Sequence, residues 1–145
     1  MKTRSIDFTL AFPQADVKTA IFLHSLPGVE LDADKNKYVL KLLKNVYGLK
    51  DAGRTWWDHL TYNLGQLQFK PSGIDPCVFI CGQNILVCYV DDCLIFSPNA
   101  EEDEKCFNDI SSKFEITDET MATQTVKTYL DFKVDNYSDR SFRIS

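Results

Sequence analysis

The chain has 145 residues, a length that fits one domain large enough to bury a core. Hydrophobic residues make up 44% and aromatic residues 12% of it, which excludes an intrinsically disordered protein. The formal net charge of −5 argues against a protein that binds nucleic acid through an overall basic surface. Because no apolar run reaches the length of a membrane span and residues 1–5 lack a signal-peptide core, we expect an intracellular, cytoplasmic protein with no membrane partner.

The first half of the chain predicts three strands and one helix. Residues 5–12 read as an apolar strand with one acid, Asp7, which must lie near an end, be paired, or bind a metal, because an unpaired buried carboxylate is costly. Residues 18–23 and 38–43 predict two further strands. Apolar residues at three- and four-residue spacing predict a helix over about 52–67, with a tryptophan pair typical of a core: Trp56, Trp57, Leu60, Leu64 and Leu67.

The second half predicts a hairpin, a helix and a closing pair of strands. A strand over 77–80 precedes the apolar run of 84–97, and a helix over 101–114 begins with acids that suit the helix dipole. Short strands are expected over 129–134 and 141–144. The whole predicts an α+β fold, in which helices pack on one face of an antiparallel sheet.

The charges are unevenly distributed along the chain. Residues 1–98 carry ten acidic and ten basic residues, whereas residues 99–145 carry eleven acidic and six basic residues. One basic cluster could follow a phosphate backbone or form a solvated face, and charge alone leaves both readings open. Its members are Lys35, Lys37, Lys41, Lys44, Lys50 and Arg54.

The cysteines predict no metal centre. They are odd in number, include no Cys-x-x-Cys pair, and lie partly in apolar runs. We therefore expect buried reduced thiols and no zinc site at Cys77, Cys81, Cys88, Cys93 and Cys106.

Two adjacent acids, Asp91 and Asp92, interrupt the apolar run of residues 84–97. Asp favours turn geometry, so the pattern predicts a hairpin with both carboxylates in its turn, and the dipeptide alone is typical of an ordinary turn. If Asp7 reaches the same edge of the sheet, the three carboxylates suit two Mg²⁺ ions about 3.5–4 Å apart, a site for phosphoryl transfer. His24 and His59 have no evident nucleophile partner, and no Gly-rich phosphate loop is present.

Four sequence blocks stand out along the chain. The first is Ile-Asp-Phe-Thr-Leu-Ala-Phe at 6–12, and the second is Lys-Leu-Leu-Lys-Asn-Val-Tyr-Gly-Leu-Lys at 41–50 followed by Ala52, Arg54 and Trp56. The third is Asp-Pro-Cys-Val-Phe-Ile at 75–80, and the fourth is Tyr-Val-Asp-Asp at 89–92. The order and spacing of these four blocks are similar to those in the palm of copia-type retrotransposon reverse transcriptases. The blocks span about residues 5–97, and residues 98–145 match more loosely. The resemblance implies one partial reverse transcriptase domain over 1–145, with a polymerase-palm-like fold and incomplete fingers.

The resemblance also implies roles for individual residues. Asp7, Asp91 and Asp92 become the catalytic and metal-binding residues for two Mg²⁺ ions, with Mn²⁺ as a substitute. Phe12 falls where similar enzymes carry a steric gate against the sugar 2′-hydroxyl, although a core phenylalanine is an equal reading. Tyr47 and Gly48 are expected under the nascent base pair. The remaining substrate-binding residues, near phosphate or template, are Lys50 and Arg54.

A second sequence resembles the first block. Residues 16–20 (Asp-Val-Lys-Thr-Ala) spell almost the usual family form, so a pattern search would choose Asp16. We prefer Asp7, because it places residues 21–23 where the family has its next strand, whereas Asp16 requires a deletion of about nine residues.

Several features depart from the family pattern. Gly53 stands where proline is usual, and Leu130-Asp131 replaces the usual Leu-Gly of the primer-gripping hairpin. Upstream fingers, thumb and RNase H regions are expected in a larger polyprotein and are absent from these 145 residues. We therefore expect little polymerase activity from this chain alone, and activity regained on fusion of a fingers segment.

The sequence thus predicts a fragment of an RNA-directed DNA polymerase. Its expected partners are an RNA or DNA template with a primer, and deoxynucleoside triphosphates. The parent element is expected in the cytoplasm, a virus-like particle or the nucleus. Two alternatives stay open: an inactive remnant that retains the fold and weak nucleic-acid binding, and an unrelated metal-dependent phosphoacceptor domain, against which the lack of alternating strand–helix units argues.

Overall fold

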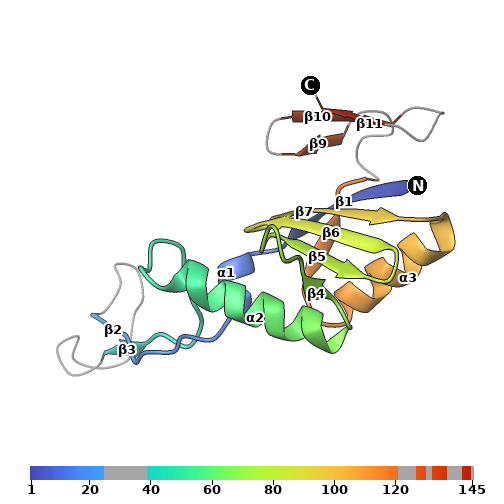
Figure 1. Cartoon of the computed structure of the whole chain (residues 1–145). Coiled ribbons are helices and arrows are strands. Elements are labelled where there is room, and N and C mark those ends of the chain that lie inside the picture. Colours follow the sequence, from blue (N-terminus) through green and yellow to red (C-terminus); the bar gives the residue numbers. More distant parts are fainter. Residues whose placement is uncertain (25–38, 121–126, 130–131, 137–141, 145) are drawn as a thin grey trace.

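A six-stranded antiparallel sheet forms the centre of the structure (Figure 1). The computed structural model describes residues 1–24, 39–120, 127–129, 132–136 and 142–144. The sheet has the strand order β4-β5-β6-β7-β1-β8. In chain order, its strands are β1 (Lys2–Phe8), β4 (Lys70–Pro71), β5 (Val78–Cys81), β6 (Asn84–Tyr89), β7 (Asp92–Ser97) and β8 (Ile116–Asp118).

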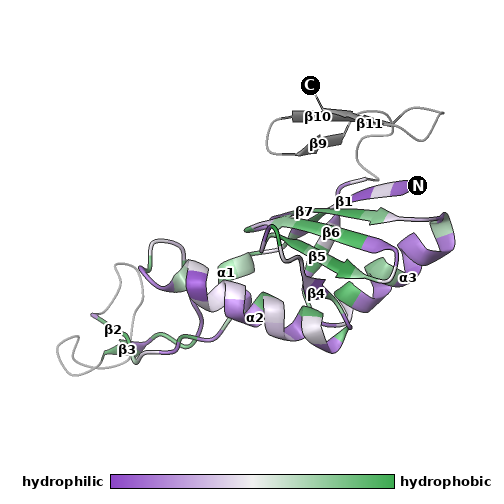
Figure 2. Cartoon of the chain, in the orientation of Figure 1, coloured by the Kyte–Doolittle hydropathy of each residue, from purple (hydrophilic) through white to green (hydrophobic). Residues whose placement is uncertain are grey.

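Helices α2 (Ala52–Gln66) and α3 (Ala100–Ser111) cover one face of this sheet (Figure 1). Side chains alternate between the two faces of a strand, and one alternate set is buried against the helices. Figure 2 shows the central strands as strongly hydrophobic, while α3 carries hydrophilic residues on its outer side. The buried set on the strands is Ile6, Phe8, Phe79, Leu86, Cys88, Cys93 and Ile95.

The two long helices form where their apolar stripes predict them. In α2 the stripe buries Trp56, Leu60 and Leu64, and the predicted helix over 52–67 is confirmed to within one residue. In α3 the Asn99 side chain accepts a hydrogen bond from the backbone N–H of Glu102, which caps the helix. These helices and the antiparallel sheet confirm the predicted α+β class.

Shorter elements lie around this centre. The short helix α1 (Ala11–Gln14) follows β1, and β2 (Phe22–Leu23) pairs with β3 (Leu40–Lys41) away from the six-stranded sheet (Figure 1). A separate three-stranded sheet has the order β11-β10-β9. Its strands are β9 (Lys127–Tyr129), β10 (Phe132–Asn136) and β11 (Phe142–Ile144).

Several predicted boundaries are wrong. The strand expected over 5–12 starts earlier and ends at Phe8, because Leu10 adopts a left-handed conformation with φ 50° and α1 follows it. Within the described residues, the strands expected over 18–23 and 38–43 shrink to the two-residue pairs β2 and β3. Strands β4, β8 and β9 were not predicted. Asp131 and residues 25–38 lie outside the described residues.

The structure pairs Cys88 and Cys93 in a disulfide, where the sequence predicts reduced thiols. The two residues face each other across the β6–β7 ladder, and their Cα atoms are 4.3 Å apart. That separation is typical of an antiparallel pair that exchanges no backbone hydrogen bonds, which brings the side chains close. The register of the hairpin, not a cysteine motif, creates the pair.

Arg4 ties β1 to α3 and β8. Its guanidinium contacts three carboxylates, at 2.9 Å for Asp103, 2.6 Å for Glu104 and 2.8 Å for Asp118. The same group lies 4.6 Å from the ring centre of Phe107. Since Arg4 and Asp103 are largely buried, this cluster fixes the order of the elements at the N-terminal half of β1.

Candidate functional site

The two residues between β6 and β7 are Val90 and Asp91, so the hairpin turn lies one residue earlier than predicted. Tyr89 pairs with Asp92, which places Asp92 in β7 and not in the turn. Val90 has a φ of 58°, whereas Asp91 has no positive φ, a combination typical of a type II′ turn. A β-branched residue rarely adopts a positive φ, so the turn is strained by about 1–3 kcal/mol.

The sheet register brings the three predicted catalytic carboxylates to one end of the sheet. Asp7 is the Cα partner of Asp92 across the β1–β7 ladder. The ladder continues one step further, because the backbone N–H of Phe8 donates to the carbonyl oxygen of Asp91 at 2.8 Å. Three acids from two distant segments therefore share one edge, as the sequence predicts.

These carboxylates repel one another. Burial raises the pKa of Asp7 above its ordinary value, and the charges of Asp91, Glu119 and Asp92 raise it further, in that order. Glu119 was missed in the sequence, because it follows the unpredicted strand β8 and is held by Ser5, whose hydroxyl donates to its carboxylate at 3.1 Å. Within the described residues, no lysine or arginine forms an ion pair with Asp7 or Asp91.

Two predicted substrate-binding residues lie beside the carboxylates. The ring of Phe12 contacts that of Tyr47, with centroids 4.6 Å apart. The pKa of the Tyr47 hydroxyl is raised by burial and by the charges of Asp91 and Asp7. Gly48 has a φ of 93°, a conformation that suits glycine. Tyr47 thus lies within the electrostatic reach of Asp91 and Asp7, and Phe12 packs against Tyr47.

Lys50 and Arg54 lie elsewhere among the described side chains. They line a cavity of about 450 Å³ together with Val17, Asn45 and Thr55. Arg54 pairs with Asp58 at 3.0 Å. Among the described residues, neither base forms an ion pair with Asp7 or Asp91.

The basic cluster is partly neutralised within the chain. Besides the Arg54 pair, Lys44 pairs with Asp16 at 2.7 Å, at an isolated bridge between the two residues. This pair lowers the pKa of the exposed Asp16 carboxyl. Asp16, the competing first-block acid, is thus engaged by Lys44 and does not perturb Asp7. Lys35 and Lys37 lie outside the described residues.

The carboxylates at the hairpin are of the ligand type that divalent cations such as Mg²⁺ prefer. No three His, Cys, Asp or Glu side chains of the described residues are grouped closely enough to form a metal cage. Mg²⁺ does not need such a cage, because it is commonly bound by one or two carboxylates together with substrate phosphates and water. The mutual repulsion at Asp7 is the feature that a cation would relieve.

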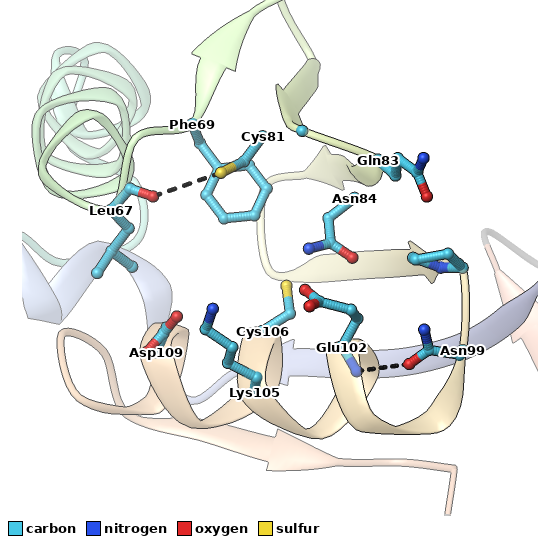
Figure 3. Close-up of a pocket in the computed structure, with 12 residues that line it drawn as sticks. Leu67, Phe69, Cys81, Gln83, Asn84, Asn99, Glu102, Lys105, Cys106 and Asp109 are labelled. Atoms are coloured by element: carbon cyan, nitrogen blue, oxygen red, sulfur yellow. Dashed lines mark hydrogen bonds between the residues drawn. The ribbon is translucent and has the colours of Figure 1, made fainter.

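A second cavity lies at the opposite end of β6 and β7 (Figure 3). It has a volume of about 410 Å³, and the side chains of Cys81, Asn84 and Cys106 line it. Burial, with the charges of Asp103 and Asp109 and the Cys81 thiol, raises the pKa of Cys106 to about 12. A thiol of that pKa is protonated at neutral pH and a poor nucleophile, so this cavity offers no reactive group comparable to the carboxylates.

Comparison with known proteins identifies a family and several long relatives. The family described as Reverse transcriptase (RNA-dependent DNA polymerase) matches residues 2–141. The Retrovirus-related Pol polyprotein from transposon RE1 of Arabidopsis thaliana is 32% identical over 79% of this chain. That from transposon TNT 1-94 of Nicotiana tabacum is 31% identical over 81%, and the Transposon Ty1-NL2 Gag-Pol polyprotein of Saccharomyces cerevisiae is 24% identical over 76%.

These relatives are much longer proteins. The matched region covers 8%, 9% and 6% of the RE1, TNT 1-94 and Ty1-NL2 polyproteins, respectively. No solved structure matches the chain. No described helix has the length and apolar character needed to cross a bilayer. By its family match and its relatives, the chain belongs to the reverse transcriptase family, in the group of copia-type retrotransposon Pol polyproteins.

Proposed function

We propose that this chain is the palm-like catalytic core of an RNA-directed DNA polymerase that uses two divalent metal ions. Asp7, Asp91 and Asp92 are the metal-binding and catalytic residues in this proposal. Mg²⁺ is the natural ion and Mn²⁺ a substitute. The substrates are a primed RNA or DNA template and deoxynucleoside triphosphates. The other parts of a longer polyprotein complete the enzyme.

The observation that carries this proposal is the register of Asp7 against Asp92, with Asp91 beside them in the turn. Backbone hydrogen bonds hold these acids together although their charges repel. When bound, the metal ions activate the primer 3′-hydroxyl and neutralise the triphosphate for in-line displacement that releases pyrophosphate. The chain's own contribution is to hold the carboxylates at one edge before substrate arrives.

Neighbouring residues shape the proposed nucleotide site. Burial and the charges of Asp91 and Asp7 raise the pKa of the Tyr47 hydroxyl, which in this proposal stays protonated beside the two acids. Phe12 lies against the Tyr47 ring, a position from which it can exclude a sugar 2′-hydroxyl. Gly48 allows the backbone to approach the base pair closely. Lys50 and Arg54 line a separate cavity, where they are suited to the phosphates of the template strand.

Metal binding tests this proposal directly. Titration of the chain with Mn²⁺, followed by calorimetry, is expected to give saturable binding. The double variant Asp7→Asn, Asp91→Asn is expected to lose at least about tenfold in affinity, because two charged oxygen ligands become neutral amides. A matched control is Asp16→Asn, which removes an acid that pairs with Lys44 and lies outside the site.

The control also tests the choice between the two candidate first-block acids. Equal Mn²⁺ affinity in the wild type and the double variant contradicts the proposal. If Asp16→Asn loses Mn²⁺ affinity and the double variant retains it, Asp16 and not Asp7 is the metal-binding acid of the first block. Primer extension by a fusion with a family-like fingers segment, lost in the double variant, extends the test from binding to catalysis.

A further inference from the structure

The indole of Trp56 forms a hydrogen bond to the strained hairpin turn. Its Nε1–H donates a hydrogen bond of 2.8 Å to the carbonyl oxygen of Val90. Trp56 lies in α2, 34 residues before Val90, so this bond links the helix layer to the turn that carries Asp91. The sequence predicts Trp56 as a core residue and gives no signal for this contact.

The donor is itself held rigidly. Only 3% of Trp56 is exposed. Its ring contacts Phe8 and Phe114 edge-on, with centroids 5.2 Å and 5.9 Å away, and it stacks on His59 at 5.9 Å. Three aromatic rings thus fix the direction in which the Nε1–H points, and Phe8 belongs to the strand that carries Asp7.

The turn is fastened at both of its carbonyl groups. Val90 oxygen accepts from Trp56, and Asp91 oxygen accepts from the backbone N–H of Phe8. Val90 has a φ of 58°, which a β-branched residue adopts only under constraint from its surroundings. Because these two bonds define the orientation of both turn peptides, they also define where the Asp91 side chain leaves the backbone.

We propose that Trp56 is a positioning residue, whose indole N–H sets the Val90 peptide so that the Asp91 carboxylate faces Asp7. Trp56 touches neither metal nor substrate in this role. The inference rests on the proposed function where metal affinity is concerned. The part of the inference that concerns the geometry of the turn does not depend on the proposed function.

The test is Trp56→Phe, which keeps an aromatic ring and removes the donor. A second variant replaces Trp56 by β-(3-benzothienyl)alanine, which keeps the ring shape and exchanges N–H for sulfur, and so covers the case in which phenylalanine impairs folding. The matched control is Trp57→Phe, since Trp57 packs against Phe79 and not against the turn. All proteins are compared by urea unfolding, by Mn²⁺ titration and by the backbone amide resonances of Val90 and Asp91.

We expect both Trp56 variants to fold, to shift the two turn resonances, and to bind Mn²⁺ about tenfold more weakly. The Trp57→Phe protein is expected to match the wild type in the last two measurements. Unshifted turn resonances in the benzothienyl variant overturn the inference. The inference is also overturned if the benzothienyl variant binds Mn²⁺ as tightly as the wild type while the double variant Asp7→Asn, Asp91→Asn loses binding. That result would leave the proposed function intact. If the wild type binds no Mn²⁺, the proposed function fails and the turn resonances alone decide the role of Trp56.

Discussion

The two halves of β1 carry acidic clusters of opposite character. At Arg4, three carboxylates surround one guanidinium, which contacts each of them within 2.9 Å. At Asp7, neighbouring acids raise the pKa of the carboxyl, and no described lysine or arginine pairs with it. The first cluster contains its cation, whereas Asp7 is held among other acids by backbone pairing, with no ion pair to a described base.

This difference separates a structural cluster from the proposed metal site. A buried charge needs a partner, and in the Arg4 cluster the partner is part of the fold. In the Asp7 cluster, the β1–β7 ladder and the Trp56 hydrogen bond hold the backbone of the acids in place. Such a site is available to a cation from solution, and the two clusters should respond oppositely to the removal of charge.

The largest expected effect is at Arg4. Arg4→Met keeps the length and apolar stem of the side chain but leaves three carboxylates facing one another, of which Asp103 is buried. Removing one partner of a buried ion pair commonly costs about 3–5 kcal/mol, and we expect about 3 kcal/mol because Glu104 is exposed. Urea unfolding measures the loss. The control Lys2→Met, on the same strand, is expected to change stability by less than about 0.5 kcal/mol, and equal losses in the two variants would remove the contrast between the clusters.

The next effect is stabilisation by a divalent cation. A ligand that binds only the folded state adds about 2.7 kcal/mol at a concentration of 100 times its dissociation constant. Mn²⁺ at that excess should therefore raise the urea midpoint of the wild type. In Asp7→Asn the same addition should have little effect, whereas Asp103→Asn should keep the response although it is less stable. A response that Asp7→Asn retains in full would place the bound ion elsewhere.

The convergence of the acids could be predicted from sequence, whereas the position of the turn could not. A strand with Asp7 and a hairpin with Asp91 and Asp92 suffice to predict a shared edge. The preference of Asp for turns suggested a turn at 91–92, but the structure places it at 90–91. A turn at 91–92 would pair Cys93 with Val90, whereas the observed ladder pairs the buried Cys93 with the buried Cys88, and this cross-strand packing outweighs the local preference.

Long-range contacts account for the rest of what sequence did not predict. Glu119 and Trp56 reach the site through the β1–β8 pairing and through the indole hydrogen bond, and neither residue has a local signal. A buried tryptophan usually finds a partner for its N–H, but its identity depends on the fold. The roles of Lys50 and Arg54 came from family resemblance, and the structure places both away from the described acids.

Replacing one acid of each cluster by asparagine should change the free energy of unfolding differently in the two clusters. Asp103→Asn weakens a charged hydrogen bond to Arg4 and should cost about 2 kcal/mol. Asp7→Asn, in buffer free of divalent cations, should leave stability unchanged or raise it, because the raised pKa of Asp7 shows that its charged form is disfavoured in the folded state. Urea midpoints at pH 7.5 in the presence of a chelator measure both. A loss at Asp7 as large as that at Asp103 would show that Asp7 has a stabilising partner after all.

The smallest expected effect is a pH dependence of stability that arises from His59, whose ring stacks on Trp56. Burial lowers the pKa of His59 below its ordinary 6.5, the charge of Lys44 lowers it further, and Asp16 opposes both. The unfolded chain therefore takes up a proton more readily than the folded one, so this contribution to stability is complete above pH 6.5 and declines as the pH falls towards the pKa of the folded state. The urea midpoint should decrease between pH 7.5 and 5.5, and His59→Phe, which keeps a ring against Trp56 and Phe114, should reduce the decrease. The control is His24→Gln, at an exposed histidine. The prediction is wrong if His59→Phe leaves the decrease in the urea midpoint unchanged and His24→Gln removes it.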